Sequence, residues 1–332
     1  MTLGHDRGRT GVHTPPFADG SAVEAHVAAD GTKSIWWNGK LVPYADAKTH
    51  VLSHALHYGT GVFEGIRAYR TPKGLAVFRL KEHLDRLLHS AKAYKIPMTF
   101  TAEALVEGCR AVVKDNGLDE CYLRPLAFVG HGPMGVYARA NPTEVVIAAY
   151  PWGAYLGADA VEKGIRVTVS SWTRLHHSSF PTTAKGSGQY LNSVLAVREA
   201  REKGFEEALL LDRNGNVAEG SGENLFLVRN GTLATPGIES SILPGITRDS
   251  VLSLAKDLGI PAEVRPITRG EVIGADELFF TGTAAEVSPI REVDAYVIGK
   301  GARGPITDRI QKAFFASVRG ENPAKSAWLT LV

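Results

Sequence analysis

Residues 180–226 read FPTTAKGSGQYLNSVLAVREAREKGFEEALLLDRNGNVAEGSGENLF, and the rest of the chain is organised around them. Lys185 lies here between Ala184 and Gly186, and apart from it no charged residue occurs over 180–196. Small neighbours let a bulky group approach the lysine nitrogen, and the lack of a nearby carboxylate leaves nothing local to hold the ammonium form. Both features suit a lysine that forms a Schiff base, whereas the alternative interpretation is an ordinary loop lysine.

Glu219 is a second candidate in the same stretch. It follows the turn at Asn214 and Gly215, lies among small residues and precedes the apolar strand expected over 225–228. A carboxylate in this position can pair with the protonated ring nitrogen of pyridoxal phosphate and keep the ring an electron sink. The alternative is a glutamate that belongs only to the turn, but the combination with Lys185 favours the functional interpretation.

The segments TAKGSGQYLNS and EGSGENLF resemble the class IV aminotransferases, which are fold-type IV pyridoxal-phosphate enzymes. Within that family the chain is most similar to the branched-chain amino-acid aminotransferases, from about Ile35 to its last residues. The resemblance implies an α+β fold of two domains with mixed sheets and the cofactor, pyridoxal 5'-phosphate, in the interdomain cleft. It also implies amino-group transfer between L-leucine, L-isoleucine or L-valine and 2-oxoglutarate. A relative acting on D-amino acids or amines, a lyase and a non-catalytic cofactor-binding protein are the alternatives.

The same resemblance implies roles for individual residues. Lys185 holds the cofactor, is displaced by the incoming amino acid and then moves the Cα proton as base and acid. The residues implied at the cofactor are Arg86, Lys185, Tyr190, Glu219, Ile246, Thr247 and Thr283. The residues implied at the substrate are Tyr58, Phe63, Tyr122, Arg124, Val136, Trp152, Tyr155, Thr283 and Ala284.

Local patterns support the phosphate residues. Leu80, Leu84 and Leu87 recur at helical spacing, and Arg86 lies on the opposite side of that helix, either in solvent or facing the phosphate across a cleft. The turn LPGITR over 243–248 opens another helix, and a glycine turn at a helix start presents backbone N–H groups to an anion. The turn over 282–285 offers a hydroxyl and further amides near the same phosphate.

Arg124 stands in the apolar strand expected over 122–129. A buried charge needs a partner, which is either a structural carboxylate or the carboxylate of a substrate. An arginine fork can bind a carboxylate through two parallel hydrogen bonds, so it suits the second role.

Composition sets limits on the class of protein. The chain has 332 residues, of which 44% are hydrophobic and 22% charged, and a formal net charge of +2. The length predicts two domains, and the charge gives no reason to expect nucleic-acid binding. No apolar run reaches the length of a membrane helix. Cys109 and Cys121 form no CxxC pair, so reduced thiols and a cytoplasmic location are the simplest expectation.

We expect a flexible tail over 1–33, a small domain over 34–151, an interdomain loop over 152–161 and a large domain over 162–332 that carries Lys185. The first 20 residues lack the apolar core of a secretory signal. Within the small domain, the pair Asn38-Gly39 between two apolar runs predicts a type I′ hairpin.

Two further motifs carry no catalytic prediction. GHGPMG over 130–135 matches GxGxxG, but no long helix follows before Asn141-Pro142, so we expect a loop rather than a dinucleotide site. The resemblance implies that this loop reaches a neighbouring subunit of a homo-oligomer, at least a dimer. His176 and His177 are expected to point to opposite faces of an extended segment, and we predict no metal site.

Overall fold

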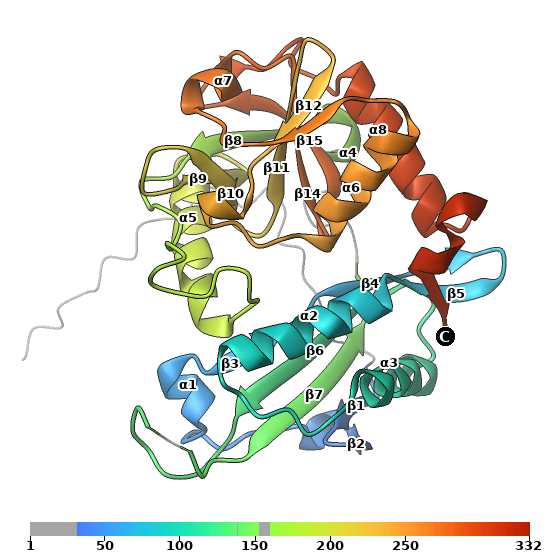
Figure 1. The fold of residues 1–332 in the computed structure, drawn as a ribbon. Coiled ribbons are helices and arrows are strands. Elements are labelled where there is room, and N and C mark those ends of the chain that lie inside the picture. Colours follow the sequence, from blue (N-terminus) through green and yellow to red (C-terminus); the bar gives the residue numbers. More distant parts are fainter. Residues whose placement is uncertain (1–31, 138, 153–159) are drawn as a thin grey trace, which may run out of the picture.

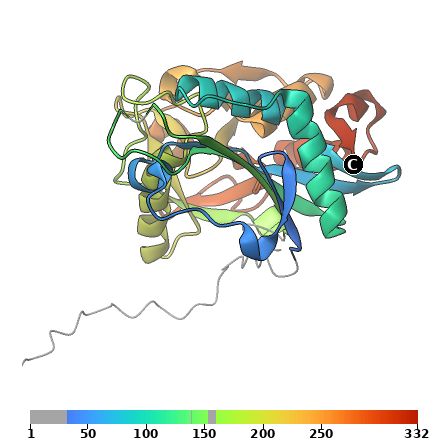
Figure 2. The same ribbon diagram turned by 90° about the horizontal axis from the view of Figure 1, so that it is seen from below.

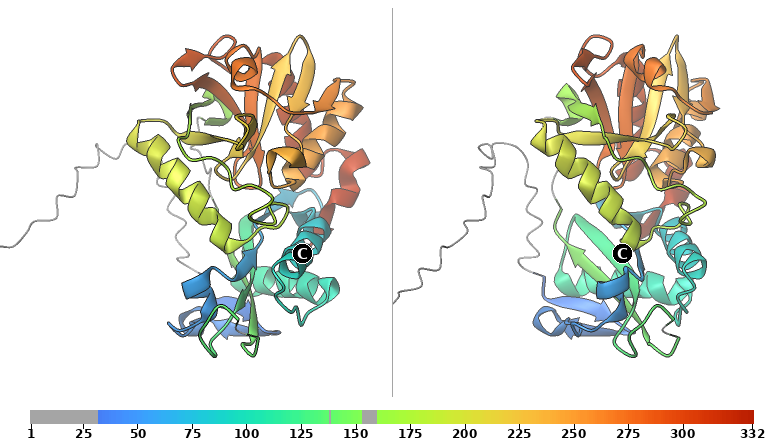
Figure 3. Two further views of the ribbon diagram at one scale, coloured as in Figure 1. Left: turned by 60° about the vertical axis from the view of Figure 1, so that its left-hand side comes forward. Right: turned by 90° about the vertical axis from the view of Figure 1, so that its left-hand side faces the viewer.

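A computed structural model describes residues 32–137, 139–152 and 160–332. These residues form two sheets, one above the other, each with its own helices (Figure 1; Figure 3). The expected α+β class is confirmed. Most of the tail and the expected pocket residue Tyr155 lie outside the described residues.

The lower sheet is antiparallel and is built mainly from the first half of the chain. Within the described ranges it has eight strands, in the order β17 (Leu329–Leu331), β5 (Gly74–Phe78), β4 (Ile66–Thr71), β6 (Cys121–Val129), β7 (Thr143–Tyr150), β1 (Ser34–Trp37) and β2 (Lys40–Pro43), with β3 (Gly61–Phe63) beside β6. Asn38 and Gly39 join β1 to β2 with φ values of 47° and 92°, the two positive angles that a type I′ turn requires.

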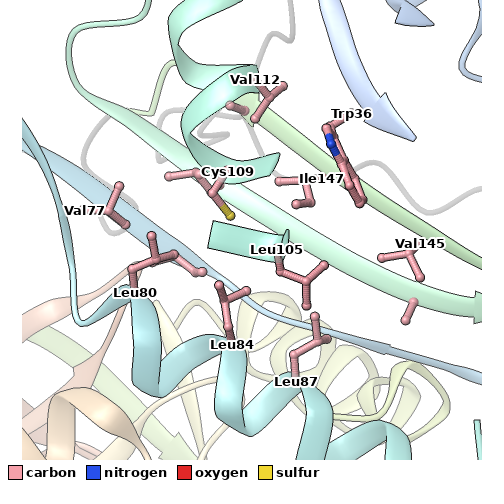
Figure 4. Close-up of a cluster of buried hydrophobic side chains, with 14 of the residues drawn as sticks. Trp36, Val77, Leu80, Leu84, Leu87, Leu105, Cys109, Val112, Val145 and Ile147 are labelled. Atoms are coloured by element: carbon pink, nitrogen blue, oxygen red, sulfur yellow. The ribbon is translucent and has the colours of Figure 1, made fainter. Parts of the chain in front are cut away.

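Two helices, α2 (Leu80–Ala93) and α3 (Ala102–Asn116), cover one face of this sheet. The predicted stripe of α2 is buried there (Figure 4) against residues of α3 and of the strands, including Trp36, Leu105, Cys109, Val145 and Ile147. Because side chains alternate along a strand, the residues between the core positions of β4 and β6 project from the other face, namely Arg67, Tyr69, Tyr122 and Arg124. This second face meets the upper part of the molecule.

The upper sheet is mixed. In the described part of the chain it has nine strands, in the order β10 (Val217–Gly220), β9 (Glu207–Leu211), β8 (Ile165–Val169), β15 (Glu286–Val293), β14 (Glu277–Gly282), β11 (Asn224–Arg229), β12 (Thr232–Thr235) and β13 (Ala262–Val264), with β16 (Tyr296–Val297) beside β15. The pairs β8–β9, β8–β15 and β12–β13 are parallel. The longer helices beside this sheet are α5 (Tyr190–Glu202), α6 (Ile246–Asp257) and α8 (Pro305–Val318). Three short α-helices also occur in the described residues: α1 (His54–Tyr58), which precedes β3 of the lower sheet, α4 (Ala160–Lys163) and α7 (Arg269–Ile273).

The end of the chain returns to the lower sheet. Strand β17 pairs with β5, so 329–331 lie apart from the rest of the span 162–332 (Figure 1; Figure 2). The reason is an apolar seam, in which the ring of Phe78 on β5 lies 5.7 Å from that of Phe314 and 5.8 Å from that of Trp328. These ring contacts pack the segment after α8 against β5.

The described residues offer neither a membrane-spanning helix nor a metal site. None of their helices combines the length and the apolar character that crossing a membrane requires. No group of three or more His, Cys, Asp or Glu side chains is gathered there as a metal site would need. The rings of His176 and His177 lie 3.9 Å apart rather than on opposite faces, because the chain turns over 177–179, so that part of the expectation was wrong.

Candidate active site

Lys185 lies where the two sheets meet. The amide of Phe63 on β3 donates to the carbonyl oxygen of Lys185 at 3.0 Å, and the amide of Lys185 donates to Ser90 Oγ on α2 at 2.9 Å. The next residue, Gly186, forms a bridge with Val62, and a Cβ atom there would come within 2.2 Å of the Tyr94 hydroxyl. The small residues after the lysine are therefore needed for the lysine segment to pack against the lower sheet.

The side chain of Lys185 ends between two aromatic rings. Its Nζ donates to Tyr190 Oη at 2.6 Å and lies 5.2 Å from the ring centre of Phe63. The rings of Phe63 and Tyr190 are 4.8 Å apart. Tyr190, the first residue of α5, thus holds the amine in one place.

A cavity opens beside this amine. It has about 560 Å³ of space free of atoms, counting the open solvent at its mouth. All seven residues expected at the cofactor line it, namely Arg86, Lys185, Tyr190, Glu219, Ile246, Thr247 and Thr283. The structure therefore brings together groups from both sheets.

Glu219 on β10 is a buried and fully engaged carboxylate. Its Oε1 accepts a hydrogen bond from Arg174 Nε at 2.6 Å, and its Oε2 accepts bonds from Asn224 Nδ2 and the amide of Leu243, each at 3.0 Å. Burial raises the pKa of Glu219 above its usual value, and Arg174 and the hydrogen bonds oppose this rise. A carboxylate with this many donors is more than a turn residue.

Arg86 is held in place by a buried acid. Its Nε and Nη2 donate to the two carboxylate oxygens of Glu64 at 2.6 and 2.8 Å, and its Nη1 donates to the carbonyl oxygen of Pro244 at 3.0 Å. His83 Nδ1 lies 2.8 Å from the same carboxylate. Burial would raise the pKa of Glu64, but Arg86 and His83 hold it far below its usual range. Since the Arg86 side chain is only 11% exposed, the solvated alternative was wrong.

Helix α6 begins at the cavity wall. Its N-cap is Gly245, where a Cβ atom would come within 2.0 Å of Asn224 Oδ1, so the turn needs glycine. The first residues of the helix, Ile246 and Thr247, line the cavity. The first amides of a helix have no partner within it and carry a partial positive charge, so this end of the cavity favours an anion.

Several of the expected substrate residues form a row on the face of the lower sheet that meets the upper part of the molecule. The guanidinium carbon of Arg124 lies 4.8 Å from the ring centre of Phe63 and 5.3 Å from that of Tyr122, and the Trp152 ring stacks on Tyr122 at 4.4 Å. Arg124 Nε is buried without a hydrogen-bond partner among the described residues, and no carboxylate there pairs with Arg124. The alternative of a structural carboxylate was therefore wrong.

Two expected pocket residues lie elsewhere. Tyr58 is 44% exposed and Val136 is 90% exposed, and neither lines the cavity of its own chain. Both belong to a surface formed by α1 and the loop 130–137, tied together by a 2.8 Å hydrogen bond between His54 Nε2 and the carbonyl oxygen of Gly135. Of the described residues expected at the substrate, Thr283 alone lines the cavity, and Ala284 follows it in the same turn.

Four residues of the site were not predicted. Arg174 and Asn224 hold Glu219, while Glu64 and His83 hold Arg86. Asn224 carried a signal, because it ends the GSGEN turn, but Arg174 and Glu64 lie 45 and 22 residues from their partners and show none in the sequence.

The donor set fits pyridoxal phosphate. Lys185 offers an amine for the aldehyde, Glu219 a carboxylate for the ring nitrogen, and Arg86 with the start of α6 a cationic end for the phosphate. Within the described part of the chain, three of the five N–H donors of Arg86 are used, which leaves two for a ligand. The fold and the cavity thus define an enzyme that works through a lysine and a phosphorylated pyridine cofactor.

Comparison with known proteins agrees. The model of the family described as amino-transferase class IV matches residues 61–293. A branched-chain-amino-acid aminotransferase of Escherichia coli K12 is 52% identical over 299 residues, which cover 90% of this chain and 97% of the relative. A solved structure of the E. coli enzyme has a TM-score of 0.88 at 51% identity and covers 90% of this chain and 98% of that one. This chain belongs to the class IV aminotransferases.

Two other solved structures show what relatives bind. The branched-chain aminotransferase of the archaeon Thermoproteus uzoniensis was solved with norvaline, and it has a TM-score of 0.86 at 47% identity. The branched-chain amino acid aminotransferase of Thermobaculum terrenum was solved in its PLP form, with a TM-score of 0.85 at 35% identity. Each alignment covers 90% of this chain and 98% of the other.

Proposed function

We propose that this chain is a pyridoxal-phosphate enzyme that transfers the amino group of L-leucine, L-isoleucine or L-valine to 2-oxoglutarate. The observation that carries the proposal is the cavity in which Lys185 Nζ, the Glu219–Arg174 pair and the start of α6 face one another. The relatives named above, which are branched-chain aminotransferases at up to 52% identity, support the choice of substrate.

The cofactor, when bound, supplies the electron sink for the reaction. Arg86, Thr247 and the amides of α6 hold its phosphate, and Glu219 holds a proton on its ring nitrogen. Lys185 Nζ would take the proton from the substrate Cα as a base and then, as an acid, give it to the C4′ carbon of the cofactor. Tyr190 donates to the ring oxygen and keeps the amine close to the reacting atoms.

The substrate carboxylate is bound by Tyr122 and by the turn amides of Thr283 and Ala284. Arg124 serves the distal carboxylate of glutamate, because it is a half-buried cation whose buried Nε has no hydrogen-bond partner among the described residues. Arg67, a second cation on the same face of the lower sheet, is instead paired with Glu286 at 3.3 Å. Phe63 and Trp152 supply apolar wall for a branched side chain.

Tyr58 and Val136 complete the pocket of a second copy. They lie on one exposed apolar surface together with other residues of α1, of the turn before it and of the loop 130–137, namely Val51, Leu52, Leu56, Met134 and Tyr137. Covering such a surface is favourable, so the active protein is at least a homodimer. Cys109 and Cys121 are both free and buried, in keeping with an enzyme of the cytoplasm.

The test is a panel of amino acids at fixed 2-oxoglutarate, scored by kcat/KM. The three branched substrates should lie within about two orders of magnitude of one another, because an apolar pocket discriminates by only about 1–3 kcal/mol per methylene. Alanine should be poorer and aspartate poorer still. Borohydride treatment of the yellow holoenzyme should fix the cofactor on the peptide that contains Lys185. Labelling of another lysine, or a D-amino acid or aspartate ranking above leucine, would overturn the proposal.

A further inference from the structure

Glu286 has an unusual backbone conformation for its residue type. It is the first residue of β15 and pairs with Gly282 across the three-residue loop 283–285. Its φ is 55°, in the left-handed region. A hairpin loop of this length commonly ends with a left-handed residue, and glycine is the usual choice because other residues pay a steric cost there. A glutamate in this place needs a compensating interaction of its side chain.

That interaction is made with the lower sheet. Tyr69 Oη donates to Glu286 Oε1 at 2.9 Å, and Arg67 Nη1 lies 3.3 Å from the same oxygen. The guanidinium of Arg67 also lies 5.1 Å from the ring centre of Tyr69. Tyr69 is 6% exposed, and the side chains of Arg67 and Glu286 are 12% and 14% exposed. A turn of the upper sheet is therefore fixed to β4 of the lower sheet by a nearly buried, charge-balanced cluster.

The turn that Glu286 closes is part of the cavity. Thr283 lines the cavity, and the loop between Gly282 and Glu286 has no other side chain fixed to the lower sheet by a hydrogen bond or ion pair that the described residues show. We propose that Glu286 is a positioning residue, which, through Tyr69 and Arg67, holds the amides of 283–285 in the place where they receive the substrate carboxylate. The inference rests on the proposed function only in taking that carboxylate as the ligand of the turn.

The test uses binding rather than turnover, so that it stands apart from the choice of substrate. The probe is 4-methylpentanoate, which has the carbon skeleton of leucine and its carboxylate but no amine, titrated into the holoenzyme and followed by the cofactor absorbance. Glu286→Gly keeps a residue suited to positive φ but removes both contacts, so its Kd for the probe should rise about tenfold. Glu286→Gln keeps an acceptor for Tyr69 Oη, so its Kd should lie between those of Glu286→Gly and the wild type.

Two further variants make the result specific. Tyr69→Phe should also raise the Kd, and its effect should be less than additive with that of Glu286→Gly, because both changes remove the same hydrogen bond. Ala295→Gly is the matched control, since Ala295 is an exposed residue with a φ of 66° at the other end of β15. It should leave the Kd unchanged.

The steady-state readout separates positioning from chemistry. KM should rise for both leucine and 2-oxoglutarate in Glu286→Gly, while kcat changes little, because the carboxylate contact is made equally before and during the reaction. A Kd within twofold of the wild type in both Glu286→Gly and Tyr69→Phe would overturn the inference. If the wild type binds the probe but fails to transaminate leucine, the proposed function fails while the positioning result stands.

Discussion

Arg174 and Glu219 form an ion pair that is almost completely buried, with side-chain exposures of 8% and 7%. Isolated charges in such a place are costly, and removing one partner leaves the other unpaired. The pair therefore keeps a carboxylate ionised in an apolar setting, where it can hold a proton on a ring nitrogen. A glutamate without this arginine would be neutral more often, since burial raises its pKa.

Glu219→Gln tests this role. The variant has nearly the same shape and can still accept one hydrogen bond, so cofactor binding should survive, but the ring nitrogen loses its ionised partner. We expect kcat with leucine and 2-oxoglutarate to fall about a hundredfold or more. The measurement is kcat together with the cofactor absorbance. Glu239→Gln, at an exposed glutamate of the short helical turn Ile238–Ser240, is the control and should match the wild type. If Glu219→Gln turns over at a near-normal rate, Glu219 has no role at the ring nitrogen and only shapes the turn.

At the residue scale, the sequence predicts those groups whose signal is local. Lys185 and Glu219 each stand in a distinctive run of small residues, so their setting is visible without a structure. The roles of Arg174 and Glu64 could be assigned only from the structure, because nothing near them in the sequence indicates a distant partner. Arg124 was predicted as a buried cation in a strand, but its partner could not be predicted, because only the structure shows that no described carboxylate pairs with it on the face it shares with Phe63 and Tyr122.

At the scale of elements, the strands β9 and β11 bring two buried acids close together. Glu207 is fully buried on β9, and Glu223, which precedes β11, is 5% exposed. Burial raises the pKa of Glu207 to about 6, and burial together with the nearby Glu207 raises that of Glu223 well above its usual value. An acid whose pKa is raised by folding binds more protons in the folded state than in the unfolded chain.

The consequence is a pH-dependent stability. Between pH 4.5, the usual value, and about 6 the free energy of unfolding should fall as the pH rises, by about 2 kcal/mol for the Glu207 shift. Glu207→Gln has no charge to bury, so it should be more stable than the wild type by about that amount at pH 8 and equal to it near pH 4.5. Denaturant unfolding at both pH values measures this. Glu202→Gln on the exposed side of α5 is the control, and equal stability of Glu207→Gln and wild type at pH 8 would refute the prediction.

Most elements were predictable because their patterns are periodic. The stripe of α2 follows the helical period and β7 follows the alternating one, whereas β14 is a continuous buried apolar run. Strand β17 was not predicted as a partner of β5, since a short apolar run carries no information about which sheet it joins. That choice was made by the aromatic seam around Phe78, which forms only when both sheets are folded.

At the scale of the whole molecule, the exposed surface of α1 and the loop 130–137 predicts association. Val136→Asp places a charge at its most exposed apolar position, so it should shift the protein toward monomers and reduce activity, because the pocket of the neighbouring copy loses a wall. Sedimentation and activity, measured on the same sample, test this. Val297→Asp, at a 63% exposed valine of β16, should change neither. A wild-type protein that is fully active as a monomer would contradict the prediction.

The pairing of β17 with β5 has a consequence for synthesis on the ribosome. The two strands are about 250 residues apart, so the edge of the lower sheet stays open while the whole upper sheet is being translated. An open edge can pair with other chains, and here it has to wait for the last strand before it is closed. A nascent chain halted after α8 should therefore be more prone to aggregate than the finished one, even with Lys185 and its entire cavity already made.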